Sequence, residues 1–512
     1  MFSIFTSLVR RTVPVFLSTA VVVLGGGIGG LSQPVQAQTS MSEADTVRVT
    51  FDEAVRTALD QNTDIKRAQA SAREANTQVQ AEWMDFAPDL RVSGNVSRNF
   101  GRTFSQEQVG FIQESSDNLN TNARSSVTLF NGFENTASLN QARNQAEASE
   151  TSLKRTRREV VFTVMEQYIS LIESREIIRV RREEVEARRQ QLRQIEEFVE
   201  AGSRPVSDRY QEEANLAEAE QNLLQAQRER EVNQTRLIQT LQLNPQKPYR
   251  FTIPDLAADT LEADQYNLSS LMEEAFENRL DLQSVEAERE AAERGVRAAR
   301  SSYYPSLSLS ARYGTRWTSR PRPLPVEGTS QPPQFAEVTP VNGAEPVTFP
   351  IPGTGGAEFR EPDFSGQLDN NRSGSISLSL TIPIFDQFQR ETQIERAQVQ
   401  AQNAKYRLQD QRQRISLQVR QAYLDYQNAV QQLEAANKRL RAAEQARASA
   451  QERYNLGSAS IVELQNARRD FINAASQQVR ARYSLLLEKK RIDYHVGRLD
   501  PGAPLIGQQD AR

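Results

Sequence analysis

Apolar residues recur every seven positions within 134–200, a stretch that contains neither proline nor glycine. The repeating positions are Val164, Leu171, Ile178, Val185, Leu192 and Val199. Arg, Glu, Gln and Ala fill most of the remaining positions, so the apolar stripe is narrow. Such a stripe predicts a coiled-coil seam rather than the wide face of a globular helix. At ~1.5 Å per residue this helix is roughly 100 Å long.

A second sequence pattern typical of a long helix follows, and both patterns recur later in the chain. A second stretch without proline or glycine covers 206–243, and seven-residue spacing returns from Val419 onward. We therefore expect two long helical hairpins, at about 134–243 and about 387–497. A shorter helix is expected from Phe51 to Phe86, because Pro88 follows it.

Four other segments alternate strictly between apolar and polar residues. They lie at about 90–99, 124–130, 306–315 and 374–382, and Ile376, Leu378 and Leu380 illustrate the alternation. This period of two predicts strands with one apolar and one polar face. By themselves the strands fit two structures equally well. One is a soluble hairpin with its apolar face on a core, and the other is a membrane barrel with that face toward lipid.

The sequence contains an internal repeat, so the predicted elements occur twice in the same order. Residues match at an offset of 217 up to Ser93 and Ser310, and at an offset of 255 from Phe130 and Phe385 onward. The extra 38 residues fall in the proline-rich segment 316–373, which is expected to be an exposed loop. The expected division is a first repeat over 38–250, an inter-repeat segment over 251–267, a second repeat over 268–499 and a tail over 500–512.

The first 37 residues have the pattern of a secretory signal peptide. Arg10 and Arg11 precede an apolar stretch, and a small-residue cleavage pattern ends at Ala37. The net charge of the whole chain is −4, so removing these two arginines leaves −6. A mildly acidic chain lacks the excess of positive charge that is typical of nucleic-acid binding, and we expect no nucleic-acid partner.

Composition removes further classes of function. The chain has no cysteine and a single histidine, His495, which excludes disulfides, thiolate metal sites and lipidation through an N-terminal cysteine. We therefore predict no enzyme, no cofactor and no metal site. The mean hydropathy of −0.63 excludes a bundle of membrane-spanning helices. His495 lies in the last predicted helical turn, where a positive charge would complement the helix dipole.

The strands and helices together favour the membrane alternative. A sheet in lipid must close, because unpaired backbone groups cannot face hydrocarbon. Four strands cannot enclose a lumen, so several chains must each contribute four. Strands of about nine residues suit a tilted membrane strand of ~9–11 residues. The sequence therefore predicts a mixed α and β membrane protein, a homo-oligomer whose shared barrel continues into a helical tube.

This arrangement resembles the TolC family of outer-membrane export channels. The resemblance covers about 51–499, and its most specific residues form the two hairpin turns, Ala201 to Asp208 and Tyr454 to Ala467. The phenylalanine turns at Leu129–Phe133 and Ile384–Phe388 are similar to the family's strand-to-helix junctions. The family implies a homotrimer with a 12-stranded β-barrel and a periplasmic α-helical coiled-coil tunnel. It also implies docking to a periplasmic adaptor and an inner-membrane transporter, in tripartite efflux or type I secretion.

The hairpin tips are the first candidate site. Gly202 and Gly457 each follow a long helix, which predicts a left-handed residue that ends the helix. In the family these tips also meet the adaptor. The residues that the resemblance assigns to adaptor docking are Gly202, Ser203, Pro205, Gly457 and Ser458. Pro205 also suits the first turn of the next helix, and Ser207 or Asp208 suits its start.

The resemblance also implies a periplasmic gate at this end. By position, Ser207 and Asp208 match gate residues of the first repeat, and Tyr454 matches a tyrosine linked to that acid. Glu463 matches an acid of the pore constriction, and Asn466 stands where some relatives have a second one. Ala459 stands where some relatives have a gate arginine. For Asp208 and Glu463, a solvated helix face is the alternative role.

These features predict a passive conduit for efflux or secretion across the outer membrane. The alternative is a periplasmic coiled-coil adaptor or an envelope-spanning tether. Such adaptors usually carry one hairpin between compact β domains, whereas this chain duplicates a strand pair and a hairpin. General porins lack long helices, and no nucleophile–base or metal constellation suggests an enzyme.

Overall fold

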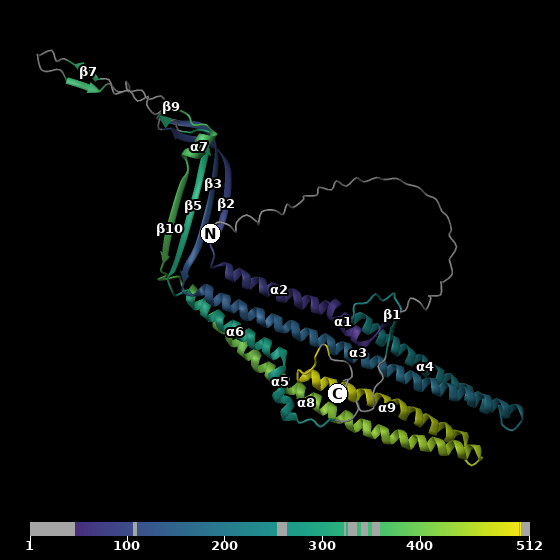
Figure 1. Cartoon of the computed structure of the whole chain (residues 1–512). Helices are drawn as coiled ribbons and strands as arrows, with labels where there is room; N and C mark the ends of the chain where they lie inside the picture. Colours follow the sequence, from purple (N-terminus) through teal and green to yellow (C-terminus); the bar gives the residue numbers. More distant parts are fainter. Residues whose placement is uncertain are drawn as a thin grey trace, which may run out of the picture. The chain divides into compact units, whose positions relative to one another are not determined.

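The computed structural model describes residues 47–105, 110–252, 264–321, 324–325, 335–338, 347–350, 359–500 and 502. The predicted signal peptide, most of the inter-repeat segment and most of the tail lie outside these ranges. Within them the chain forms long helices and one four-stranded sheet (Figure 1). None of the helices in the described ranges combines the length and apolarity needed to cross a membrane.

The first repeat begins with a short strand and ends with a helical hairpin. Its elements are β1 (Val47–Val49), α1 (Phe51–Gln61), α2 (Thr63–Met84), β2 (Asp89–Ser105), β3 (Gly110–Asn131), α3 (Glu134–Glu200) and α4 (Val206–Thr240). The single helix expected over 51–86 is in fact two helices. Asn62 separates them, because its side chain accepts from Asp64 N and caps α2 at 2.8 Å.

The second repeat has the same order with an insertion between its strands. It follows β4 (Tyr249–Phe251), which lies where the first repeat meets the inter-repeat segment. Its main elements are α5 (Leu268–Asn278), α6 (Leu280–Ser301), β5 (Ser306–Thr318), β10 (Ser373–Thr381), α8 (Gln389–Asn455) and α9 (Ile461–His495). The insertion contains β6 (Leu324–Pro325), β7 (Phe335–Val338), β8 (Val347–Pro350), β9 (Phe359–Arg360) and α7 (Phe364–Asn370). The segment expected to be a loop is therefore partly structured. Gln367 of α7 accepts from Thr318 N at 2.9 Å and so holds the end of β5.

The sheet is antiparallel, in the order β10-β5-β3-β2. Strands β2 and β3 are longer than the predicted 90–99 and 124–130, because their pairing also includes 100–105 and 110–122. Polar residues occupy both faces there and hide the alternation. Arg98 and Asp117, for example, are cross-strand partners joined by an ion pair of 2.6 Å. Period-two reasoning fails where cross-strand pairing of polar residues replaces burial.

One face of this sheet is apolar and uncovered. Leu309 pairs with both Val127 and Leu378, so apolar residues lie side by side across three strands. The exposed fraction is 76% for Val96 and 80% for Ile376. Strands β2 and β10 each have one neighbour in the described sheet and are its edges. A sheet with this exposed apolar surface is not that of a soluble monomer.

Helix packing joins the two repeats. Helix α3 packs against α2, α4, α6 and α9, and α8 packs against α6 and α9. The larger core surrounds Tyr168, which is fully buried against Phe51 and Phe251. Strand β1 runs parallel to β4 beside this core, and the Tyr168 hydroxyl donates to Thr252 O. Burial, more than any neighbouring charge, raises the pKa of Tyr168 to about 12.

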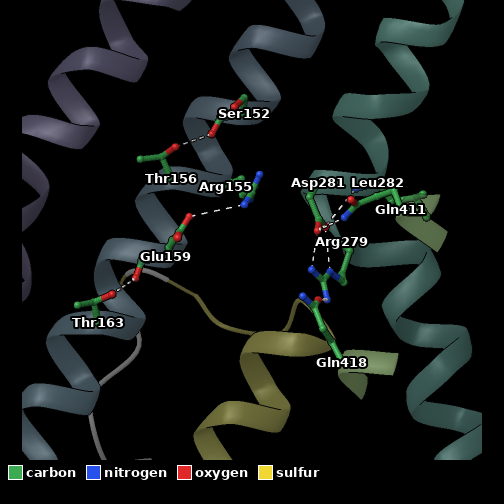
Figure 2. Close-up of polar contacts among 10 residues, drawn as sticks. All are labelled: Ser152, Arg155, Thr156, Glu159, Thr163, Arg279, Asp281, Leu282, Gln411 and Gln418. Atoms are coloured by element: carbon green, nitrogen blue, oxygen red, sulfur yellow. Dashed lines mark hydrogen bonds and ion pairs between the residues drawn. The ribbon is translucent and has the colours of Figure 1, made fainter. Parts of the chain in front are cut away.

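A polar joint fixes the start of α6 on α8 (Figure 2). Arg279 Nε donates to Asp281 Oδ1 at 2.9 Å, and its Nη1 donates to Gln418 Oε1 at 2.7 Å. Gln411 Nε2 donates to the other carboxylate oxygen of Asp281 at 2.6 Å. Burial raises the pKa of Asp281, but the hydrogen bonds and charge of Arg279 outweigh it, so this pKa lies below its usual value. The joint sets where α6 meets the long helix.

The only histidine of the sequence is neutral rather than cationic, contrary to the helix-dipole expectation. Burial, followed by the charges of Arg279 and Arg491, lowers the pKa of His495 to about 4. The unfolded side chain takes up a proton near pH 6.5, whereas the folded one resists protonation until about pH 4. Stability is therefore lost as the pH falls through this window.

We expect acidification from pH 7 to pH 4 to destabilise the wild type more than His495→Gln, by about 1–2 kcal/mol after allowance for partial exposure. Urea titrations of the helical circular-dichroism signal at several pH values measure the difference. Parallel pH profiles for the two proteins would contradict the assignment.

Candidate gate at the hairpin tips

Both hairpins turn through the same backbone motif. Gly202 and Gly457 have φ angles of 67° and 71°, the left-handed conformation expected for the residue after a helix. Ser203 N donates to Phe198 O at 2.9 Å, and Ser458 N donates to Arg453 O at 2.8 Å. With the Gly202 N to Val199 O and Gly457 N to Tyr454 O bonds, each tip is a Schellman motif. The predicted role of the two glycines as helix terminators is confirmed.

The returning helices start differently in the two hairpins. Pro205 is the N-cap residue of α4 and stands just before its first turn, not within it as expected. Ser207 and Asp208 lie inside that turn, and Ser207 is exposed. In the second hairpin Ser460 caps α9 by accepting from Glu463 N at 3.2 Å. All the candidate docking residues lie on these short exposed turns.

Arg204, which was not singled out from the sequence, connects the two tips. Its Nη1 lies 3.3 Å from Asp208 Oδ2, and its guanidinium carbon lies 5.1 Å from the ring centroid of Tyr454. Tyr454 is 6% exposed, and its hydroxyl has no hydrogen-bond partner among the described residues. Burial is the largest cause of its raised pKa. Asp208 and Tyr454 are thus connected through Arg204 rather than directly.

The other two gate candidates are paired within the second hairpin. Arg453 Nη1 donates to Glu463 Oε1 at 2.6 Å, and both side chains are about half exposed. Asn466 Oδ1 accepts from Arg469. The carboxylate of Glu463 is therefore partly neutralised by an arginine one helix turn before the tip.

A buried carboxylate lies behind the tips, on the α4 face that meets the neighbouring helices. Glu212 is 1% exposed, and Arg188 Nη1 of α3 donates to its Oε1 at 3.2 Å. Gln465 Nε2 of α9 donates to Glu212 Oε2 at 3.0 Å, across the boundary between the hairpins. Asn215 Nδ2 donates to the same oxygen at 2.9 Å. Glu212 thus ties both hairpins of the chain together.

Sequence reasoning missed Glu212, although a signal was present. Glu212, Ala219, Ala226 and Asn233 are spaced by seven and form the seam of α4. A charged residue at a seam position needs a partner, because an unpaired buried charge is costly. The partners Arg188 and Gln465 lie on other helices, so no local pattern indicated them.

Comparison with known proteins agrees with this architecture. The family model for outer membrane efflux proteins matches residues 54–241 and 271–498. No curated protein matched the chain by sequence. Among solved structures, the CmeC outer membrane channel of Campylobacter jejuni is similar, with 17% identity and a TM-score of 0.69. The match covers 90% of this chain and 87% of that one.

Two further solved structures have the same fold. The outer membrane protein VceC of Vibrio cholerae shares 16% identity over 87% of this chain and 96% of its own, with a TM-score of 0.66. The open state of the MtrE outer membrane channel of Neisseria gonorrhoeae shares 18% identity over 90% of this chain and 93% of its own, with a TM-score of 0.63.

The fold and the family model define an efflux channel protein of the outer membrane. The chain belongs to the outer membrane efflux protein family, in which the TolC resemblance is confirmed. Its localisation is the outer membrane, with a periplasmic extension. Members of this family are outer-membrane efflux channels.

Proposed function

We propose that three copies of this chain form one channel-tunnel for export across the outer membrane. Each chain contributes its four strands to a 12-stranded barrel, with the apolar face toward lipid, and its hairpins to a periplasmic tunnel. The sheet carries this proposal, because it has two free edges and an uncovered apolar face. Neither feature is stable in a monomer, and closure with other copies removes both.

The internal repeat supports contact between copies. In the first repeat, Phe162 of α3 stacks on Tyr494 of α9, with ring centroids 4.5 Å apart. The equivalent of Phe162 in the second repeat, at an offset of 255, is Leu417 of α8, which is 60% exposed. Likewise, Leu224 of α4 is 65% exposed, whereas its equivalent Val479 of α9 is buried. Helix α4 of a neighbouring copy can therefore cover α8 as α9 covers α3.

We further propose that the hairpin tips form the gate and the docking site for a periplasmic adaptor. The mouth is held closed by the partly exposed ion pairs Arg204–Asp208 and Arg453–Glu463 and by the contact of Arg204 with the Tyr454 ring, and weak links of this kind can be exchanged. Gly202 and Gly457 have no atom near the position of an added Cβ, so both tips are accessible. The adaptor opens the mouth and connects it to an inner-membrane transporter.

Reconstitution tests the channel. The full-length protein, purified in detergent from outer membranes, should cross-link as a trimer and conduct ions in a planar bilayer. A protein that is soluble without detergent, or one that inserts without conducting even after the gate is loosened, would refute the conduit. Cross-linking at residues beside Gly202 and Gly457 in cells should capture the adaptor.

The Arg204→Ala channel should be open more often. The substitution removes one ion pair and one cation–π contact, together worth about 1 kcal/mol, which shifts a closed–open equilibrium roughly fivefold. Arg209→Ala is the matched control, because Arg209 also lies near the start of α4 and pairs with Glu213 at 3.4 Å. Single-channel open probability is the measurement. Equal open probabilities in the two variants would contradict a role of Arg204 in the gate.

A further inference from the structure

Three arginines lie side by side across the polar face of the sheet. Arg91 of β2 pairs directly with Arg124 of β3, and Arg124 pairs directly with Arg312 of β5. Ser375 of β10 continues the row on the other side of Arg312. Directly paired residues of antiparallel strands point to the same face, so the three guanidinium groups share one level of the sheet. All three arginines are exposed.

Within the described residues, only Arg91 of this row forms an ion pair. Like charges directly opposite one another destabilise a sheet, so such a row needs counter-charge. Asp89 supplies part of this counter-charge, because its Oδ2 lies 3.0 Å from Arg91 Nε. The other oxygen of Asp89 accepts from Ser126 N and Ser126 Oγ, at 2.7 and 2.8 Å. Arg124 and Arg312 form no ion pair with any described residue.

Most residues beside the row are uncharged and polar. On the same face, Ser93 and Asn122 are paired two residues from Arg91 and Arg124 on one side of the row. Ser310 lies two residues from Arg312 on the other side. Arg316 of β5, opposite Asn120, adds a fourth positive charge on this face. Hydroxyl and amide groups can complete hydrogen bonds to an anion without adding charge. The face therefore has net positive charge, although the whole chain is acidic.

We propose that Arg91, Arg124 and Arg312 form an anion-binding row for cargo that carries several carboxylate or phosphate groups. Guanidinium forks match carboxylate and phosphate oxygens in a bidentate geometry. Cα atoms of directly paired residues are about 4.5–5.5 Å apart, so neighbouring guanidiniums can bind adjacent anionic groups of one molecule. The proposal rests on the barrel described above, in which the polar face lines the lumen and three rows form one ring.

Block of the current by a polyanion tests the row. Tripolyphosphate, added to full-length channels in a planar bilayer on the side of the β2–β3 turn, should block the wild type. In Arg124→Gln/Arg312→Gln, the concentration for half block should rise on the order of tenfold. The Arg124→Lys/Arg312→Lys protein keeps the charge but loses the bidentate guanidinium forks, so its half-block concentration should lie between those of the wild type and the glutamine variant. Removing adjacent like charges should not impair folding.

Arg102→Gln is the matched control. It removes one exposed positive charge per chain where the glutamine double variant removes two, and Arg102 lies on the apolar face, with its guanidinium 5.7 Å from the Phe111 ring centroid. This variant should be blocked like the wild type. An unchanged half-block concentration in the glutamine variant, or an equal shift in Arg102→Gln, would contradict the anion-binding role of the row. Neither result would contradict the channel function. Inserted protein without any current would instead count against the channel function on which the row depends.

Discussion

Glu212→Ala should lower the free energy of unfolding by about 3–5 kcal/mol, because it leaves a buried arginine without its partner. The side chain of Arg188 is 11% exposed and that of Glu212 is 1% exposed, so water replaces little of the lost interaction. The variant also removes the acceptor of Gln465, the contact that joins α4 to α9. Urea titration of the helical circular-dichroism signal in detergent measures the loss.

Glu213→Ala is the matched control for this prediction. Glu213 is the next residue of α4, has a side chain 45% exposed, and pairs only with Arg209 at 3.4 Å in the described residues. Its removal should cost about 0–0.5 kcal/mol, as for other exposed helical pairs. Similar losses for the two variants would mean that Glu212 is not a joint between the hairpins.

Leu378→Arg should prevent stable insertion into the outer membrane. Leu378 lies in the middle of β10 on the apolar face, paired with Leu309. An arginine near the bilayer midplane destabilises a membrane barrel by about 2–4 kcal/mol, and a trimer would carry the substitution three times. The amount of protein that resists urea extraction from outer membranes reports the effect.

Ser377→Arg tests the same strand from its other side. Ser377 pairs with Ser310 on the polar face, so its replacement adds the same charge one residue away. We expect insertion close to that of the wild type, because lumen positions tolerate charge. Loss of insertion in both variants would argue against the assignment of the two faces.

Much of the fold can be predicted from periodicity. Seven-residue spacing of apolar residues without proline or glycine indicated α3, and the internal sequence repeat indicated its counterpart α8. The ends of both helices follow from Gly202 and Gly457, since glycine readily adopts the left-handed conformation. These features are local, so neighbouring residues alone specify them.

Prediction failed where distant residues set the structure. The β2–β3 hairpin extends to Ser105 and Gly110 because polar side chains pair across it, and no alternation marks such pairing. The resemblance indicated Asp208 and Tyr454, but it gave no sign of Arg204, which lies between them. Burial of Glu212 depends on α3 and α9 together.

The sequence by itself determined the types of element, their duplicated order and the family, because helix seams, strand alternation and turn glycines are written in short-range patterns. Only the tertiary structure decided which charges meet. Arg91, Arg124 and Arg312 become neighbours through the register of three strands. Register depends on backbone pairing between segments far apart in the chain, and a shift of one residue would move every side chain to the other face.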